Sequence, residues 1–419
     1  MIKPEILGRA ESLEDSSNVE RKKHLLKLKI LQYFYFEGAK TNSQICDHFN
    51  ISSPTSVKIL NQLRKERWVK KDGTGKSVGG RKPDLYHLEE NSFYVVGVQL
   101  NRFRIRTAIF DNHSSKILEL EETPFNIEKE KNVVDHLYRL IKSLIKGSNL
   151  PSDKLMGIGV SMPGLVSSQE GKNFTYFSSE EQSESLQRVL QERLEKPVHF
   201  LNDAKSACLA ESKFGLAKNR KNVLVISMDW GIGLGIIVDG KMHQGTSGFA
   251  GEFGHIPLVD DGRLCHCGKR GCLETVASGM ALTRMVQEGI RAGESSILNK
   301  LSPEELEGLQ PETIIEAANQ GDQFAINTLS KVGIDLGKGI AILIQLLNPE
   351  LIILEGKFAD AKQFITTPIQ QSMNTYCMAQ LREKTKIELS SLGKDSVLLG
   401  SVAKVMESIF EEQIAMVSN

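Results

Sequence analysis

The chain has 419 residues, of which 40% are hydrophobic and 25% are charged, and its formal net charge is zero. This length exceeds that of one ordinary domain, so two or three compact units are expected. The first twenty residues lack the apolar core of a secretory signal, and the longest strongly apolar stretch, Ile340–Leu347, is too short to cross a bilayer. These features exclude a secreted or membrane-embedded protein and predict a cytoplasmic one.

The N-terminal part of the chain predicts two helices after a flexible arm of residues 1–18. From Glu20 to Phe36 apolar residues recur at helical spacing, and Gly38 ends the pattern. Thr41 and Gln44 then form a capping box, in which each residue satisfies a free backbone group of the other. The helix that this box opens is expected to run to about Phe49.

A third helix and a hairpin follow. Ser53-Pro54 is typical of a helix start, because the missing N–H of proline costs nothing there. Val57, Leu60 and Leu63 are expected on its inward face. Two strands, Trp68–Lys71 and Leu85–Leu88, enclose a glycine-rich turn. Residues 19–90 are therefore predicted to form a winged helix-turn-helix domain.

This domain is predicted to bind double-stranded DNA, because residues 1–90 carry 17 basic against 12 acidic residues. The second helix of such a motif enters the major groove, where hydroxyls and amides contact bases and cations neutralise phosphates. Gly79-Gly80-Arg81-Lys82-Pro83 in the wing resembles minor-groove hooks built on Gly-Arg-Pro. A protein-interaction module with a basic face is the alternative, and the hairpin argues against it. The expected DNA-binding residues are Thr55, Ser56, Lys58, Asn61, Gln62, Arg64, Arg81 and Lys82.

Beyond Asn91 strands and helices alternate, which favours an α/β domain over residues 91–419. A three-strand meander is expected first, and a similar plan starts again near Asn222. The expected strands are Phe93–Gln99, Phe103–Asp111, Lys116–Glu122, Leu155–Met162, Val198–Leu201, Asn222–Asp229 and Leu234–Asp239. The expected long helices are Met280–Ala292, Glu312–Asn319 and Gln323–Leu347.

Three of the six cysteines lie within eight residues, at Cys265, Cys267 and Cys272, and His255 precedes them. Three thiolates and one imidazole at this spacing can complete a tetrahedron around zinc. Four protein ligands leave no open position, so one structural Zn²⁺ per chain is expected. His266 is a rival imidazole, disfavoured because it stands between two ligands. Buried free thiols are the simpler alternative.

The C-terminal region carries five further motifs: Gly251-Glu-Phe-Gly-His255, Cys265-His-Cys-Gly-Lys-Arg-Gly-Cys-Leu-Glu274, Asn202-Asp203-Ala204, Ser161-Met-Pro-Gly164 and Asn348-Pro-Glu350. These motifs resemble those of the ROK family (repressors, open reading frames and sugar kinases). The resemblance spans about residues 91–410, and the N-terminal module fits the repressor branch. It implies an actin-like (ribonuclease H-like), two-lobed fold with a sugar cleft, and it implies the same four zinc ligands in a loop of about residues 251–274.

The resemblance also implies the residues that contact a sugar. Carboxylates and amides suit this task, because each hydroxyl of a hexose both donates and accepts hydrogen bonds. His255 would use one ring nitrogen for zinc and the other for a hydroxyl. Asp203 matches the general base of the kinases, here a vestigial catalytic position. The implied sugar-binding residues are Asn202, Asp203, Glu252, His255 and Glu274.

The phosphate-binding turns of the kinases are altered in this chain. Where kinase members carry Asp-x-Gly-Gly-Thr, this sequence has Gln99-Leu-Asn-Arg-Phe103, and their Gly-Thr-Gly turn corresponds to Asp229-Trp-Gly231. A glycine run of the kinases corresponds to Glu355-Gly-Lys357. Added carboxylates repel a triphosphate, although Arg102 or Lys357 would offset part of this repulsion.

The sequence therefore predicts a sugar-responsive transcription regulator, by family precedent a repressor, that acts as a homodimer or homotetramer on a DNA operator. Its effector is expected to be a sugar or sugar derivative. The first alternative is an active ATP-dependent sugar kinase with a DNA-binding module. The second is a regulator controlled by a protein partner through the zinc loop.

Overall fold

The computed structural model describes residues 6–7, 17–75, 82–130, 132–177 and 185–418. The chain divides into two compact units, one of residues 1–201 with 401–419 and the other of residues 202–400. The predicted N-terminal arm falls almost entirely outside the described residues, and so does Arg81. None of the helices in the described residues has the length and hydropathy of a membrane span.

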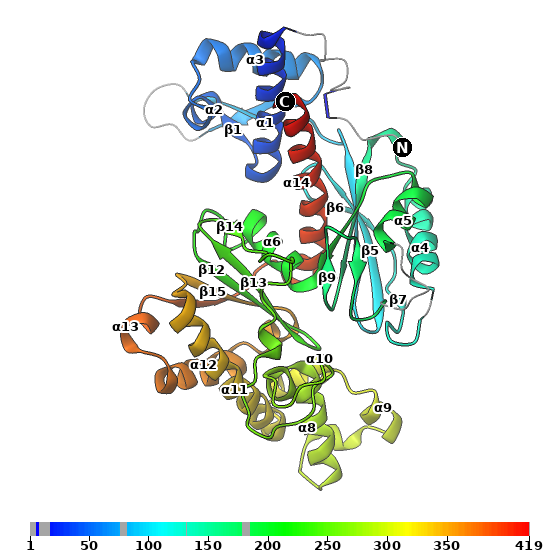
Figure 1. The fold of residues 1–419 in the computed structure, drawn as a ribbon, viewed down its shortest axis with the longest axis vertical. Coiled ribbons are helices and arrows are strands. Elements are labelled where there is room, and N and C mark those ends of the chain that lie inside the picture. Colours follow the sequence, from blue (N-terminus) through cyan, green and yellow to red (C-terminus); the bar gives the residue numbers. More distant parts are fainter. Residues whose placement is uncertain (1–5, 8–16, 76–81, 131, 178–184, 419) are drawn as a thin grey trace. The chain divides into compact units, whose positions relative to one another are not determined.

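The first unit begins with three helices and a small sheet (Figure 1). The helices are α1 (Asn18–Glu37), α2 (Asn42–Phe49) and α3 (Ser53–Lys65). The sheet has the order β1-β3-β2, formed by β1 (Lys40–Thr41), β2 (Val69–Thr74) and β3 (Asp84–Leu88). The predicted capping box is confirmed: the Gln44 N–H donates to Thr41 Oγ1 at 3.3 Å, and the Thr41 N–H donates to Gln44 Oε1 at 2.9 Å. Strand β1, too short to leave a pattern, was not expected from the sequence.

The inward face of α3 differs from the prediction by one residue. Ser56 is fully buried, whereas Val57 is 39% exposed. Ser56, Ile59, Leu60 and Leu63 stand at i, i+3, i+4 and i+7, so they share one helix face, and Val57 lies about 100° away from it. The predictions that Ser56 is exposed to DNA and that Val57 is buried are therefore wrong.

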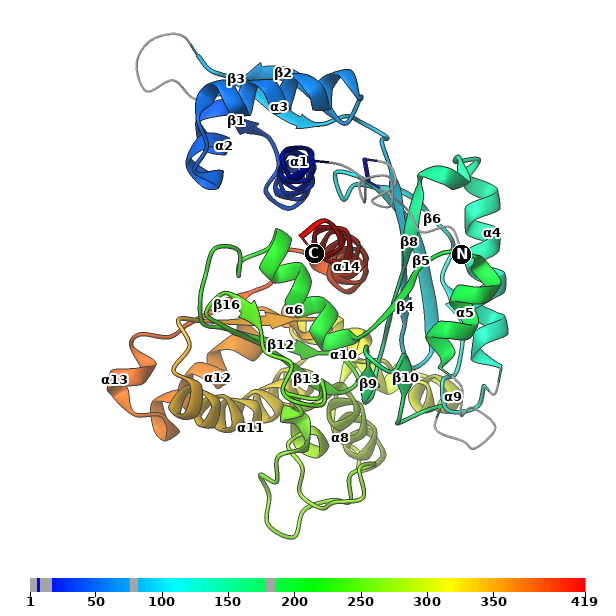
Figure 2. The ribbon, with the colours of Figure 1, turned by 45° about the horizontal axis from the view of Figure 1, so that its top comes forward.

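The remainder of the first unit is a six-stranded sheet with helices on both faces (Figure 2). Apolar side chains of the sheet pack with those of α4 (Val133–Ser148) and α5 (Leu186–Leu194). The C-terminal helix α14 (Ser396–Ser418) covers the opposite face, where a Cβ on Gly159 would meet Ser401 O at 2.1 Å. The predicted meander is confirmed as antiparallel β4-β5-β6. The strands are β4 (Tyr94–Leu100), β5 (Arg104–Asp111), β6 (Lys116–Glu119), β7 (Thr123–Pro124), β8 (Leu155–Met162) and β11 (Val198–Asn202), with β9 (Val166–Ser167) and β10 (Lys172–Asn173) as a separate pair.

The second unit is built around a five-stranded sheet of order β14-β13-β12-β15-β16. Helix α6 (Asp203–Phe214) packs on one face, and four long helices bury the other. The strands are β12 (Val223–Met228), β13 (Ile232–Val238), β14 (Lys241–Met242), β15 (Leu351–Glu355) and β16 (Lys386–Leu389). The four helices are α8 (Gly279–Arg291), α10 (Pro311–Asn319), α11 (Gln323–Leu347) and α12 (Gln363–Tyr376), and the shorter ones are α7 (Glu274–Ala277), α9 (Pro303–Glu307) and α13 (Ala379–Arg382).

Candidate metal and sugar site

The four predicted zinc ligands lie together in the second unit. The possible ligand atoms of His255, Cys265, Cys267 and Cys272 are all within 4.8 Å of one another. His255 Nδ1 is 3.6 Å from Cys265 Sγ, and Cys267 Sγ is 3.6 Å from Cys272 Sγ. Spacings of this size suit four ligands around one tetrahedral ion, because zinc–sulfur bonds are about 2.3 Å long. The donor set therefore fits Zn²⁺.

The cysteine loop is fixed by its own backbone rather than by regular strands. Leu258 N–H donates to Gly271 O at 2.8 Å, and Cys265 N–H donates to Lys269 O at 2.7 Å. Gly271 has φ +76°, and a Cβ there would stand 1.9 Å from Val259 O. Only glycine fits this position, so the loop can turn back between the ligands Cys267 and Cys272.

His255 has one ring nitrogen on each side of the site. Its Nδ1 faces the thiols, and its Nε2 is 4.0 Å from Glu252 Oε2. His255 closes a short 3-10 helix, Phe253–His255, which directly follows Glu252. A metal-bound His255 would therefore keep Nε2 toward the carboxylate of Glu252, as the two-sided role predicted from the sequence requires.

Glu274 is buried at the start of α7 and has two partners. Its Oε2 accepts the Ile232 N–H at 3.1 Å, and its Oε1 is 3.2 Å from His266 Nδ1. Gly231 makes room for this carboxylate, since a Cβ on Gly231 would lie 2.5 Å from Glu274 Oε2. His266, which sequence reasoning treated only as a rival zinc ligand, instead contacts the predicted sugar residue Glu274.

Asn202 and Asp203 stand where β11 passes into α6. Asn202 caps the helix by accepting the Lys205 N–H at 3.2 Å, and Asp203 Oδ1 accepts the Ala204 N–H at 2.8 Å. Burial, together with the neighbouring carboxylates of Asp229, Glu355 and Glu252, raises the pKa of Asp203 to about 7. Such a carboxyl can accept a sugar hydroxyl, and its pKa also suits a general base near neutral pH.

Lys205 was not among the predicted site residues, but it lies close to the carboxylate of Glu252. It is 6% exposed, its ammonium donates to Gly248 O, and it lies 6.0 Å from the centre of the Phe249 ring. Burial raises the pKa of Glu252, while the charges of His255 and Lys205 lower it. Lys205 therefore connects α6 to the loop before Glu252 and supplies positive charge to an acidic site.

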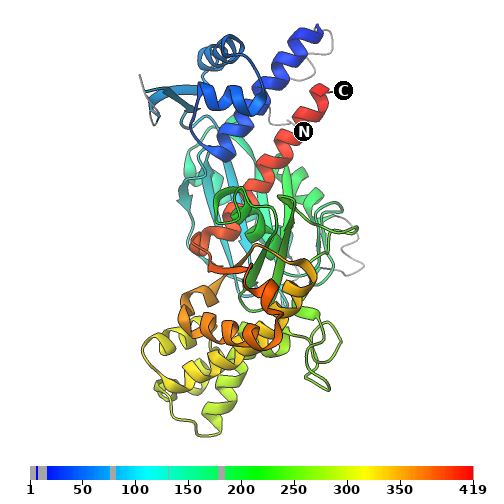
Figure 3. The same ribbon diagram turned by 90° about the vertical axis from the view of Figure 1, so that its left-hand side faces the viewer.

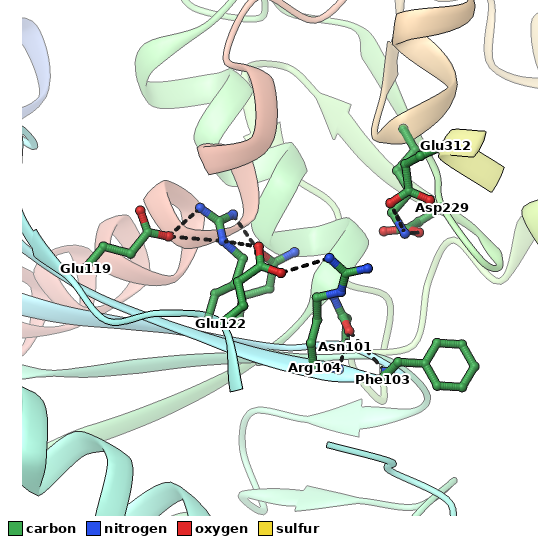
Figure 4. A network of polar contacts seen from close by, with 10 residues as sticks. Asn101, Phe103, Arg104, Glu119, Glu122, Asp229 and Glu312 are labelled. Carbon is green, nitrogen blue, oxygen red and sulfur yellow. Dashed lines mark hydrogen bonds and ion pairs between the residues drawn. The ribbon is translucent and has the colours of Figure 1, made fainter. Parts of the chain in front are cut away.

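A second cluster of charged residues lies at Asp229-Trp-Gly231, the turn that corresponds to the phosphate-binding Gly-Thr-Gly turn of the kinases. Lys357 Nζ lies 3.0 Å from Asp229 Oδ1 and 2.8 Å from Glu312 Oε1 (Figure 4). Glu312 stands in the first turn of α10 and was not among the predicted site residues. Glu355 is buried next to this turn and accepts hydrogen bonds from Ser227 and Ser396. Lys357 is thus neutralised by two carboxylates.

The other altered turn lies in the first unit and is closed by its own side chains. Asn101 Oδ1 accepts the Phe103 N–H at 3.1 Å and the Arg104 N–H at 2.9 Å (Figure 4). Arg102, the other cation considered as an offset, is 2.8 Å from Glu128. Gln99 Oε1 accepts a hydrogen bond from Arg106 at 3.2 Å. The Phe103 and Arg104 N–H groups of this turn are therefore bonded within the turn itself.

Most of the predicted DNA-binding side chains are exposed on α3. Thr55, Lys58, Asn61 and Arg64 are exposed, as is Lys82 in the wing, while Gln62 is partly buried. Asn42 Nδ2 donates to Ser53 Oγ at 2.9 Å, which ties the start of α2 to that of α3. The exposed face of α3 thus carries hydroxyl, amide and cationic groups, although Ser56 faces inward.

Two mixed sheets flanked by helices, a cysteine–histidine loop and a winged helix-turn-helix module at the N-terminus define an α/β protein with a separate N-terminal module. The ROK family profile matches residues 95–407, and the chain belongs to the ROK family. The predicted ROK membership and the actin-like α/β fold are therefore confirmed.

Similar proteins include regulators over almost their whole length. The xylose repressor of Caldicellulosiruptor bescii is 27% identical over 92% of this chain and 96% of the repressor. The DNA-binding transcriptional dual regulator NagC of Escherichia coli K12 is 29% identical over 94% of this chain and 95% of that protein. A crystal structure of a ROK family transcriptional regulator, a homologue of the E. coli MLC protein, covers 95% of this chain and 100% of its own, with 24% identity and a TM-score of 0.77.

Proposed function

We propose that the protein is a sugar-responsive, DNA-binding transcriptional repressor whose ROK domain binds a sugar without phosphorylating it. The observation that carries this proposal is the combination of a winged module with the Asp229–Lys357–Glu312 cluster. Relatives matched over more than nine tenths of this chain are transcriptional regulators, and such a match has to include most of residues 1–90. The protein would act in the cytoplasm as a homodimer or homotetramer, since a two-fold assembly fits an inverted-repeat operator.

The sugar would bind to Asn202, Asp203, Glu252, His255 and Glu274. Support comes from Glu252, which faces His255 Nε2, and from Glu274, which is held in place by the Ile232 N–H. One structural Zn²⁺ would be held by His255, Cys265, Cys267 and Cys272, whose ligand atoms fit a single ion. This ion would fix the loop between Glu252 and Glu274 and so position both carboxylates.

The second candidate is an active ATP-dependent sugar kinase, and one observation favours it. Burial raises the pKa of Asp203 to about 7, which is suitable for a general base. Phosphoryl transfer depends mainly on positioning and on charge stabilisation by the phosphate-binding groups. Because Lys357 is already neutralised by Asp229 and Glu312, we rank the kinase second.

A panel of sugars in a thermal-shift assay tests the proposal. Pentoses, hexoses and N-acetylhexosamines are added with and without magnesium-ATP, and ADP formation is followed in the same samples. We expect at least one sugar to raise the melting temperature equally with and without ATP, and no sugar-dependent ADP. Sugar-dependent ADP formation would instead identify a kinase. Operator binding without any thermal response to a sugar would favour control by a protein partner.

A further inference from the structure

The turn between β5 and β6, residues 112–115, contacts three separate parts of the winged module within the first unit. Asn112 is fully buried although it is polar. Its Nδ2 donates to Glu89 O at 2.9 Å, and its Oδ1 accepts the Ser92 N–H at 3.3 Å. Both ends of this amide therefore bind the segment that connects β3 of the module to β4 of the sheet.

The same turn also contacts α1 and β3. Ser114 Oγ donates to the hydroxyl of Tyr35 at 3.4 Å, and the ring of His113 lies 5.9 Å from that of His87 on β3. The turn itself is held firmly, because Asp111 Oδ1 accepts the N–H groups of His113 and Ser115, both at 2.8 Å. A preformed turn of the larger domain thus contacts the first helix, the wing strand and the connecting segment of the module.

Aromatic packing extends this contact to the C-terminal helix. Tyr35 is 5% exposed, and its ring lies 5.8 Å from Phe93 and 6.3 Å from Phe410 on α14. Helices α1 and α14 lie side by side (Figure 3). The contact between the rings of Tyr35 and Phe410 joins these two helices. Lys154, in the short 3-10 helix Ser152–Lys154 before β8, also binds the connecting segment: its Nζ donates to Asn91 O at 2.8 Å. An unstructured linker would have exposed backbone groups, whereas here they are bonded at Glu89, Asn91 and Ser92.

We propose that the β5–β6 turn is a joint that fixes the orientation of the winged module on the first lobe, and that this joint transmits the sugar response to DNA. The second half of this proposal rests on the proposed function, whereas the first half does not. Coupling between two binding sites needs an element that both ligands bias. A rigid joint makes the module follow the lobe, whereas a loose linker would let it move independently.

Time-resolved fluorescence anisotropy of Trp68 tests the joint without DNA or sugar. The chain has two tryptophans, and Trp68 lies in the module just before β2, so a Trp230→Phe background leaves one probe. We compare the unaltered joint with Asn112→Ala and, as a milder change, with Tyr35→Phe combined with Ser114→Ala. Asn126→Ala is the matched control, because Asn126 closes a turn of the same unit, with Oδ1 accepting the Glu128 N–H at 3.1 Å.

With the joint intact, we expect the anisotropy of Trp68 to decay through fast local motion of the side chain and through the rotational tumbling of the whole protein. The joint variants should add a nanosecond component from separate motion of the module, and Asn126→Ala should not. Circular dichroism and melting curves identify any variant that fails to fold. If Asn112→Ala fails to fold, the test rests on Tyr35→Phe combined with Ser114→Ala, which removes only two hydroxyl groups. Joint variants whose anisotropy decay matches that of the parent protein would overturn the proposal.

A second arm measures the transmission itself. Operator affinity is measured with N-acetylglucosamine and with D-xylose, the sugars in the names of relatives, for the wild-type protein and the joint variants. For a sugar that changes wild-type affinity, we expect that change to shrink severalfold in the variants while affinity in its absence is retained. An unchanged sugar effect would overturn transmission through the joint. Absence of any DNA binding by the wild-type protein would count against the proposed function and leave the anisotropy result standing.

Discussion

The acidic side chains of the candidate sugar site are held in unequal electrostatic environments. Asp203 combines burial with three neighbouring carboxylates, whereas Glu252 also has the charges of His255 and Lys205 nearby. Burial costs a carboxylate more than it costs the neutral acid. A ligand that brings hydrogen-bond donors to Asp203 would therefore favour its ionised form.

Asp203→Asn should change how stability depends on pH. The folded protein holds the Asp203 proton more tightly than the unfolded chain, because burial raises the pKa from 3.8 to about 7. The stability gained from this proton is fully present below about pH 4 and is lost as the pH rises toward 7. We expect the melting temperature of Asp203→Asn, relative to wild type, to increase between pH 4 and 7 and then level off. Asp153→Asn, at an exposed position, should track wild type, and a parallel course for Asp203→Asn would contradict the raised pKa.

Replacing Lys357 tests the role of the charged cluster at Asp229-Trp-Gly231, the turn that binds phosphate in the kinases. Lys357→Met would leave Asp229 and Glu312 facing one another without a cation, so we expect a loss of about 1–3 kcal/mol in unfolding free energy. Lys338→Met is the control, because Lys338 pairs with one carboxylate among the described residues, Asp335 at 2.8 Å, and its loss should cost less than about 1 kcal/mol. If Lys357→Met were as stable as wild type but lost a melting shift caused by ATP, Lys357 would be a nucleotide ligand.

At the scale of elements, the cysteine loop connects metal binding to the sugar site. Glu252 and Glu274 lie at its two ends, and the loop between them is held by backbone hydrogen bonds and isolated β-bridges rather than by regular strands. We expect Cys272→Ser, or removal of metal by a chelator, to abolish the sugar-induced rise in melting temperature. Cys377→Ser is the matched control, since Cys377 lies outside the loop. A full sugar response in Cys272→Ser would show that the metal is unnecessary for binding.

Helix α3 is the element predicted to read DNA bases. Asn61 is exposed on it, and an amide can bond two positions of one base. We expect Asn61→Ala to weaken operator binding by about 1–3 kcal/mol and to relax the preference at one base pair. Ser56→Ala, on the buried face, should leave that preference unchanged. Equal selectivity of Asn61→Ala and wild type would place base recognition elsewhere.

Elements with strong local signals were predictable, and α11 and β8 have the expected bounds Gln323–Leu347 and Leu155–Met162. Glycine and proline punctuation and long apolar runs determine such elements locally. The phase of α3 was not predictable from Val57, because Ser56 is small enough to be buried against its neighbours. Periodicity alone favours the more apolar residue.

The candidate site was predictable where a dense motif defines it, as for His255 and the three cysteines. The contacts of Lys357 with Glu312, of His266 with Glu274 and of Lys205 with Gly248 were not. Lys357 and Glu312 are 45 positions apart, and only the fold brings them together. Contacts between distant residues leave no periodic signal.

For the molecule as a whole, a repressor requires that sugar and operator compete for its conformations. The two ligands must then change each other's affinity by the same factor, commonly about 5- to 150-fold. Such linkage needs no chemical reaction and therefore no bound triphosphate. The ion pairs of Lys357 with Asp229 and Glu312, at the turn that binds phosphate in the kinases, agree with this. A kinase, by contrast, would consume its sugar.

The most direct measurement is operator binding by fluorescence anisotropy, using a DNA fragment selected from a random pool with the wild-type protein. The sugar found by thermal shift is added with and without magnesium-ATP, and sugar phosphate is assayed in the same tubes. We predict a several-fold change in operator affinity that is identical with and without ATP, and no sugar phosphate. Stoichiometric sugar phosphate together with unchanged operator affinity would contradict a repressor that binds its sugar without reacting with it.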